Sequence, residues 1–177
     1  TGVQTCALPI YATEFWNSKL IPNLSQAIEL STLTEILFAN PDKAFNDYSH
    51  ALGIGNLRYF LISGKGIIES IQNDNMTVAV QTKNSKLQIV LATEFIFGNA
   101  VRDASGLINI NEFTNTMDFN NVSAEINTII RTQVLPSFKR DAKAGNAIEF
   151  TGAIELNKGH LTLTDIEVIP VQLKIIQ

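Results

Sequence analysis

The sequence has almost no cysteine, because Cys6 is the single one among 177 residues. One thiol excludes an internal disulfide and any site built from several thiolate ligands. Histidine is nearly as scarce, and His50 and His160 do not stand at a spacing typical of metal ligands. The sequence therefore predicts no disulfide framework, no metal site and no cofactor.

Long apolar runs and an excess of basic residues are also missing. No apolar run approaches the roughly 20 residues that a membrane-spanning helix needs. The 13 basic and 17 acidic residues leave a net charge of −4, whereas nucleic-acid-binding modules usually carry a basic surface. Nucleic acid is therefore a disfavoured partner, and the 45% hydrophobic content indicates one compact domain.

The first ten residues, TGVQTCALPI, match the translation of a DNA sequence used as a sequencing-library adapter. The alternative is a genuine apolar leader, but this stretch has no basic start, contains Pro9 and lacks a small-residue cleavage site. We interpret residues 1–10 as an adapter-derived artefact. Any signal peptide or lipid anchor is then expected upstream of Tyr11.

Residues 11–56 are predicted to form an N-terminal helical extension. Apolar residues recur at helical spacing from Phe15 to Ile28, and Pro22 divides this first helix. Two short helices follow. Thr32 with Glu35 predicts a capping box for one, and Asn40 before Pro41 predicts the start of the other.

From residue 57 the apolar pattern changes to a period of two, which is typical of strands. Strands are predicted over residues 58–63 and 65–72 with a bend at Gly64, then over 76–81 and 86–91. Turns are expected at residues 73–75 and 83–85. These segments together predict a three-stranded meander.

A long amphipathic helix is predicted from Asn121 to Gly145, bent at Pro136. A hairpin follows, with strands over residues 148–156 and 161–169 and a turn between them. The alternation of the second strand slips by one residue, which predicts a bulge near Asp165.

The order of three strands, a helix and two strands is that of the OB-fold, a five-stranded Greek-key barrel with its helix between the third and fourth strands. We therefore predict a mainly β fold with helices (α+β), whose barrel domain covers residues 57–177. A simple meander packed under a helix is the alternative, because periodicity does not reveal strand order in space.

The polar segment 98–106 is the first candidate for a ligand-binding loop. Arg102 offers several donors, and Asn99, Asp103 and Ser105 offer acceptors suited to a polyhydroxylated ligand or a carboxylate. The competing interpretation, which we favour, is structural, with Asp103 in a turn and Arg102 paired with a carboxylate or loop carbonyls.

Four aromatic residues resemble the stacking platforms of OB barrels: Tyr59, Phe60, Phe95 and Phe97. Alternate strand positions must fill the core, so we expect one or two of the four to be exposed. Tyr59 joins the candidate ligand-binding residues. A hydrolase or lyase would instead require Arg102, Asp103 and His160 to converge around one pocket.

Three segments carry a resemblance to a known family: residues 52–60 (LGIGNLRYF), 96–106 (IFGNAVRDASG), and 152–156 (GAIEL) running on to Ile169-Pro170. They resemble the bacterial family of domain of unknown function 2291, described as predicted periplasmic lipoproteins. The resemblance extends over nearly all of residues 11–177.

The resemblance implies a signal-bearing envelope protein that is often encoded beside sugar ABC-transporter components and has no established activity. We therefore expect a non-enzymatic periplasmic lipoprotein that contacts the membrane only through an anchor missing from this chain. Expected partners are a transporter component, a sugar-binding protein or a small-molecule ligand. The alternatives are an OB-fold module that binds single-stranded nucleic acid and an uncharacterised hydrolase.

Overall fold

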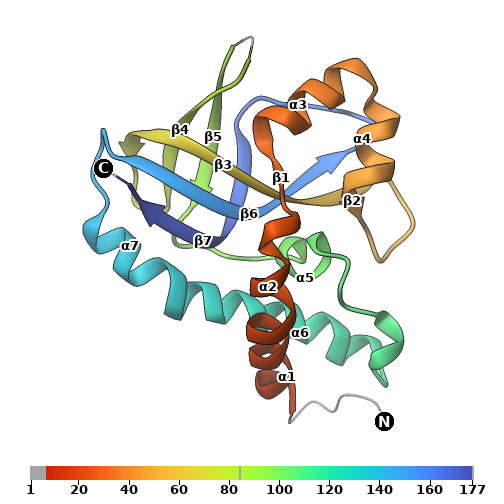
Figure 1. Ribbon diagram of the computed structural model, residues 1–177. Helices are drawn as coiled ribbons and strands as arrows, with labels where there is room; N and C mark the ends of the chain where they lie inside the picture. Colours follow the sequence, from red (N-terminus) through yellow and green to blue (C-terminus); the bar gives the residue numbers. More distant parts are fainter. Residues whose placement is uncertain (1–6, 84, 177) are drawn as a thin grey trace.

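The computed structural model describes residues 7–83 and 85–176. Residues 1–6, Asn84 and Gln177 lie outside the described range. The range therefore omits Cys6 and most of the adapter-like decapeptide. It also omits the centre of the expected 83–85 turn and the last residue of the expected barrel domain. Five strands form a closed barrel (Figure 1): β3 (Leu57–Ile71), β4 (Asn75–Gln81), β5 (Lys86–Ala92), β6 (Ala147–Asn157) and β7 (Ile166–Ile175).

The strand order confirms the predicted OB-type Greek key. The neighbours run β3-β4-β5-β7-β6, and β6 pairs with β3 to close the barrel. β5 and β7 are parallel, while the other pairs of barrel strands are antiparallel. The final hairpin therefore lies beside the opening three-stranded unit, and the simple meander is wrong.

The barrel interior is filled by alternate residues of each strand, as the period of two requires. On β6 the inward side chains are Ile148, Phe150, Ile154 and Leu156, all of them buried. Helices α3 (Leu30–Ala39) and α4 (Pro41–Tyr48) add Leu33, Leu37 and Phe45 to this core, and helix α7 (Leu135–Asp141) adds Phe138. Figure 1 shows α7 on the opposite side of the barrel from α3 and α4.

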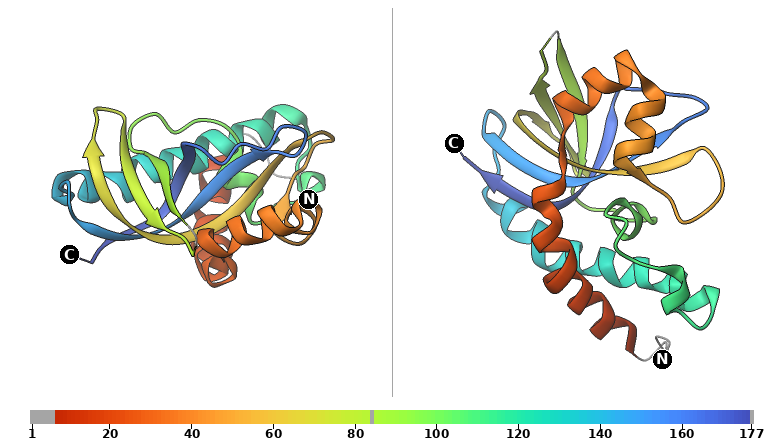
Figure 2. Two further views of the ribbon diagram at one scale, coloured as in Figure 1. Left: turned by 90° about the horizontal axis from the view of Figure 1, so that it is seen from above. Right: turned by 45° about the vertical axis from the view of Figure 1, so that its right-hand side comes forward.

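A second core lies outside the barrel, between the sheet and the remaining helices. We call it the outer core, and we call the core inside the barrel the inner core. It contains side chains of α1 (Leu8–Phe15), the π-helical turn η2 (Trp16–Leu20), α5 (Ala100–Ala104) and α6 (Thr116–Ile129). The right view of Figure 2 shows α1 and α6 below the barrel, where the two helices cross in contact, and Tyr11 packs edge-to-face on Phe113 beside them. None of the described helices is long and apolar enough to cross a membrane.

The N-terminal region differs in several details from the prediction made from the sequence. The rod that begins with α1 continues through η2 into α2 (Ile21–Asn23), η3 (Leu24–Gln26) follows, and Ile28 lies in a short strand, β1 (Ile28–Glu29), parallel to β3. Helix α3 begins at Leu30 with Glu29 at its N-cap, so the predicted capping box of Thr32 is wrong. Asn40 is confirmed as a cap, because its side chain accepts a hydrogen bond from the Lys43 amide at 3.1 Å.

The long helix begins earlier than predicted. Asn115 caps α6 by accepting a hydrogen bond from the Asp118 amide at 2.8 Å, so the helix starts at Thr116 instead of Asn121. It widens into a π-helical turn, η5 (Ile130–Val134), before Pro136. A proline ring clashes with the carbonyl group four residues before it, which explains why the helix changes geometry there. It then ends at Asp141, short of Gly145.

Two predicted irregularities of the strands lie elsewhere. β3 runs unbroken through Gly64, and its register shift lies between Ile68 and Ser70. The predicted bulge near Asp165 is wrong: Asp165 adopts a left-handed conformation (φ 51°) immediately before β7 begins, so residues 161–164 lie outside the strand. The register shift between β6 and β7 lies instead after Thr151, against Pro170 and Gln172.

Candidate functional site

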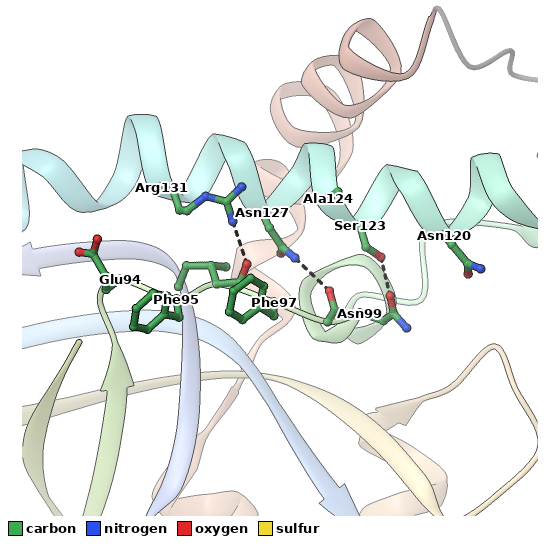
Figure 3. Close-up of a pocket in the computed structure, with 11 residues that line it drawn as sticks. Glu94, Phe95, Phe97, Asn99, Asn120, Ser123, Ala124, Asn127 and Arg131 are labelled. Atoms are coloured by element: carbon green, nitrogen blue, oxygen red, sulfur yellow. Dashed lines mark hydrogen bonds between the residues drawn. The ribbon is translucent and has the colours of Figure 1, made fainter.

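An extended segment, residues 93–99, leaves β5 and runs along α6 before α5 begins at Ala100. The segment and the helix enclose a groove of about 530 Å³. A volume of this size falls in the range of small-molecule sites. Figure 3 shows the groove with the segment on one side and the polar face of α6 on the other.

Three hydrogen bonds fasten the segment to the helix. The Arg131 guanidinium donates to the Ile96 carbonyl at 2.8 Å, and the side-chain amide of Asn127 donates to the Gly98 carbonyl at 3.0 Å. The Ser123 hydroxyl donates to the Asn99 side-chain oxygen at 2.7 Å. Residues four apart lie on one face of a helix, so these donors form a ladder along α6–η5 (Figure 3).

Phe95 and Phe97 project from this fastened segment. Their rings are nearly parallel, at an interplanar angle of 9° and a centroid distance of 6.1 Å. They are 61% and 72% exposed, whereas Phe60 is buried and Tyr59 is half-buried. The expectation that one or two of these four aromatics would be exposed is confirmed.

The charged groups of the groove balance one another. Glu94 lines it and forms an ion pair with Lys139 of α7. Arg131 lines it too, with its donors directed to the Ile96 carbonyl and the Thr128 hydroxyl. The other polar groups are uncharged, namely the amides of Asn99, Asn120 and Asn127 and the hydroxyl of Ser123. The lining therefore combines an apolar aromatic pair with a neutral polar face.

Of the five residues predicted from the sequence, Asn99 alone lines this groove. Ser105 is buried, and its hydroxyl accepts a hydrogen bond from the Leu107 amide at 3.3 Å. Tyr59 lies on β3 opposite Glu155 of β6. Burial, followed by interaction with Glu155, raises the pKa of Tyr59 to about 12.

Arg102 and Asp103 form a buried ion pair, 4% and 5% exposed. Two hydrogen bonds of 2.6 and 3.1 Å join them, and a third runs from Arg102 to the Phe119 carbonyl at 3.1 Å. The guanidinium also lies 3.8 Å above the centre of the Phe119 ring. The pair thus ties α5 to α6, and a ligand-binding role for Arg102 and Asp103 stays a prediction.

A smaller cavity of about 220 Å³ adjoins the groove and shares Phe97, Gly98 and Asn99 with it. Its lining includes two carboxylates, Glu155 of β6 and Glu167 of β7. Burial raises the pKa of Glu167, and repulsion by Glu155 adds to the effect. The cavity that adjoins the groove is therefore acidic, whereas neither carboxylate lines the groove itself.

The histidines do not join these groups. His160 is exposed after β6, and no hydrogen bond links its side chain to Arg102 or Asp103 within the described part of the chain. His50 lies beside Gly106, and burial, together with the charge of Arg58, lowers its pKa. Residues 7–83 and 85–176 contain no cluster of His, Cys, Asp and Glu that fits a metal ion.

Comparison with known proteins places the chain in a family. The family model described as predicted periplasmic lipoprotein (DUF2291) matches residues 6–174. The chain belongs to this family. The resemblance inferred from three short segments is thereby confirmed.

A solved structure agrees with the fold. The crystal structure of an OB-fold protein from Thermotoga maritima matches with a TM-score of 0.83, at 28% identity, and the match covers 99% of each chain. No curated protein matches significantly. The DUF2291 chain thus shares its barrel and its added helices with a protein that is described by its fold.

Sequence reasoning missed the helix side of the groove in this DUF2291 protein. Asn120, Ser123, Asn127 and Arg131 line it, and the prediction used α6 mainly for its apolar stripe. A signal was present, because Ser123, Asn127 and Arg131 recur every four residues beside that stripe. Their partners are backbone and side-chain groups some 24 to 35 residues earlier, which the spacing does not identify.

Proposed function

We propose that this DUF2291 protein is a non-enzymatic accessory protein of the bacterial envelope that acts with a sugar ABC transporter. In this proposal it is tethered to the membrane by an N-terminal lipid anchor, and the groove beside α6 is its binding surface. Family membership supports the envelope location. The transporter association rests on the resemblance, because members of the family are often encoded beside sugar ABC-transporter components.

The observation that carries the proposal is the exposed, parallel pair of Phe95 and Phe97 on a fastened segment. Two exposed aromatic rings leave apolar surface in contact with water. A ligand or partner that covers the rings removes this surface from water, which favours binding. Rigid aromatic side chains bind with little loss of conformational entropy. These features favour a binding surface.

The groove chemistry supports a non-enzymatic role. A hydrolase would need a nucleophile within hydrogen-bond reach of a base that a third group orients. In the groove, Ser123 instead donates to Asn99, and Glu94 is paired with Lys139. Neither histidine lines the groove.

Uptake of the sugar carried by the neighbouring transporter tests the proposal. We expect deletion of the gene to lower radiolabelled sugar uptake, and the full-length protein with its native leader to restore it. The Phe95→Ser/Phe97→Ser variant should fail to restore uptake at equal abundance. The matched control is Phe38→Ser, because Phe38 is 82% exposed on α3 and does not line the groove.

Co-purification identifies the partner. The tagged full-length protein is extracted in detergent and, separately, in native-lipid particles, and the transporter permease and the sugar-binding protein are probed in each eluate. We expect at least one of them to be retained. Unchanged uptake in the deletion strain, together with clean failure of both purifications, would refute the proposal.

Single-stranded nucleic acid is the alternative occupant of an OB barrel with exposed aromatics. The net charge of −4 and the one-to-one balance of Glu94 and Arg131 in the groove disfavour it. A labelled oligonucleotide titrated at low salt decides between the two. Tight binding that weakens steeply with salt would favour the alternative.

A further inference from the structure

We propose that the groove between residues 93–99 and α6 binds a neutral sugar ring. The ring's apolar C–H face would lie on Phe95 and Phe97, and its hydroxyl groups would bond to the asparagines of the polar face. This inference rests on the proposed function in one respect, that the groove is the binding surface. It adds the chemical class of the ligand.

The aromatic side of the groove fits one face of a sugar ring. Phe95 and Phe97 point the same way from an extended segment, because residues two apart share one side. Their nearly parallel rings present apolar faces and edges side by side. A sugar ring carries C–H groups on its faces and hydroxyl groups around its rim, so it is amphipathic in the way this groove is.

The polar side of the groove offers donors and acceptors together. Asn99 uses its side-chain oxygen for Ser123, which leaves its NH₂ group to donate. Asn127 uses its NH₂ group for the Gly98 carbonyl, which leaves its side-chain oxygen to accept. Asn120, which also lines the groove, makes no side-chain hydrogen bond to the other residues that the structure describes, so its amide can donate and accept. A hydroxyl group donates and accepts at once, so it matches this mixed set.

The charges of the groove disfavour an ionic ligand. Glu94 and Arg131 contribute one charge of each sign, and Glu94 is paired with Lys139. A phosphate or carboxylate ligand would lie near the carboxylate of Glu94, and Arg131 already uses a donor of each terminal nitrogen for Ile96 and Thr128. A neutral polyhydroxylated ring avoids that cost.

The ladder to α6 prepares the groove before the ligand arrives. Ile96, Gly98 and Asn99 are each bonded to the helix, so the backbone that carries both phenylalanines is already ordered. Binding then costs little additional conformational entropy. This preorganisation favours affinity for a ligand that fits the groove.

Amide-resolved NMR of the purified ¹⁵N-labelled chain tests this inference. The probes are methyl α-D-glucopyranoside, methyl α-D-galactopyranoside and myo-inositol, with cyclohexanol as the control ring that carries a single hydroxyl group. We expect saturable shifts at residues 94–99 and 120–131 with at least one of the three polyols. Cyclohexanol should bind more weakly by about tenfold or more, the equivalent of one or two lost hydrogen bonds.

Variants locate the contacts. Phe95→Ser/Phe97→Ser should weaken the best polyol by about tenfold or more, as loss of an aromatic stacking surface does. Asn120→Ala should weaken it severalfold, and Phe38→Ser should leave it unchanged. All four replaced side chains are exposed, so the far-ultraviolet circular dichroism of each variant should stay that of the parent chain.

Three results would overturn the inference: no shift with any polyol at saturating concentration, equal binding of cyclohexanol and the polyols, or equal binding by Phe95→Ser/Phe97→Ser and the parent. The uptake experiment is independent. Loss of uptake without sugar binding removes this inference and keeps the proposed function. Sugar binding without any effect of the deletion on uptake removes the proposed function and keeps this inference.

Discussion

Replacing Gly64 by alanine tests how the barrel interior is packed. Gly64 lies on β3 directly opposite Phe150 of β6. Phe150 is 2% exposed and among the largest side chains of the inner core. A Cβ atom at position 64 would lie 2.6 Å from the Cζ atom of Phe150, closer than real Cβ contacts come. The phenylalanine ring therefore occupies the space that a side chain at position 64 would need.

The structure gives the expected free energies. Gly64→Ala should cost about 1–3 kcal/mol from overpacking, reduced by about 0.5–1 kcal/mol because alanine loses less backbone entropy than glycine in a strand. Phe150→Ala should cost about 3–5 kcal/mol, the usual range for a buried phenylalanine. In the Phe150→Ala background the new methyl group enters vacated space, so Gly64→Ala should become neutral or stabilising. The coupling free energy should reach about 1–2 kcal/mol.

Urea denaturation of the four chains measures this cycle. Trp16, the one tryptophan of the sequence, is buried in the outer core and reports unfolding by fluorescence. The control is Gly66→Ala, whose Cβ atom would lie 2.6 Å from the backbone oxygen of Ala79 and 2.7 Å from a methyl carbon of Val78. Both obstacles remain when Phe150 is replaced by alanine, and the nearer one is backbone, so the cost of Gly66→Ala should be the same in both backgrounds. Costs of Gly64→Ala and Phe150→Ala that add to within about 0.5 kcal/mol would refute the packing argument, as would a loss below about 1 kcal/mol for Phe150→Ala alone.

Three further predictions concern the outer core, the strand register and pH. Asp103→Ala should lower the free energy of unfolding by about 3–5 kcal/mol, because it leaves Arg102 buried without its carboxylate; a melt like that of the parent would contradict a structural role for the pair. Gly152→Ala should cost about 1–3 kcal/mol, because its Cβ atom would meet the Ile169 backbone oxygen, and unaltered stability would show the register to be wrong. Burial raises the pKa of Glu167 in the folded chain, which penalises its carboxylate at neutral pH. Glu167→Gln should therefore stabilise the protein slightly at pH 7, by up to about 0.5 kcal/mol. The advantage should disappear below pH ~4, where the glutamate is protonated in both the folded and the unfolded chain. An equal difference in the free energy of unfolding at the two pH values would contradict this.

Elements with one buried face were predictable from the sequence. On β6 the alternation of Ile148, Phe150, Ile154 and Leu156 identified the inward residues, because strand side chains alternate between two faces and only one faces the barrel interior. The order of strands and the long helix together indicated the OB-type barrel. The pairing of β6 with β3 that closes this barrel confirmed it.

Boundaries and irregularities were less predictable, because they depend on neighbours distant in the sequence. Asn115 carried a local signal for the start of α6 that the apolar stripe concealed. The left-handed Asp165 and the register shift at Thr151 could not be located from alternation alone. A bulge moves along a strand until the side chains on both sides of it find their places against the neighbouring strand.

The candidate site was also only partly predictable from the sequence. Asn99, Arg102 and Asp103 were all candidates for ligand binding, but only Asn99 of the three lines the groove, while Arg102 and Asp103 lie buried against Phe119. Both groups stand in one short polar segment with similar chemistry. Whether a polar side chain near α5 points outward or under the helix depends on where α6 lies across it, and local sequence does not contain that information.

By itself, the amino-acid sequence determined the barrel class, the inward faces of its strands and the family, because these follow from periodicity and from residues close together along the chain. Only the tertiary structure decided that Phe95 and Phe97 stay exposed on a segment fastened to Ser123, Asn127 and Arg131. The physical reason is that each of these hydrogen bonds joins residues at least 24 positions apart. Their partners become neighbours only when the barrel closes and α6 packs against it.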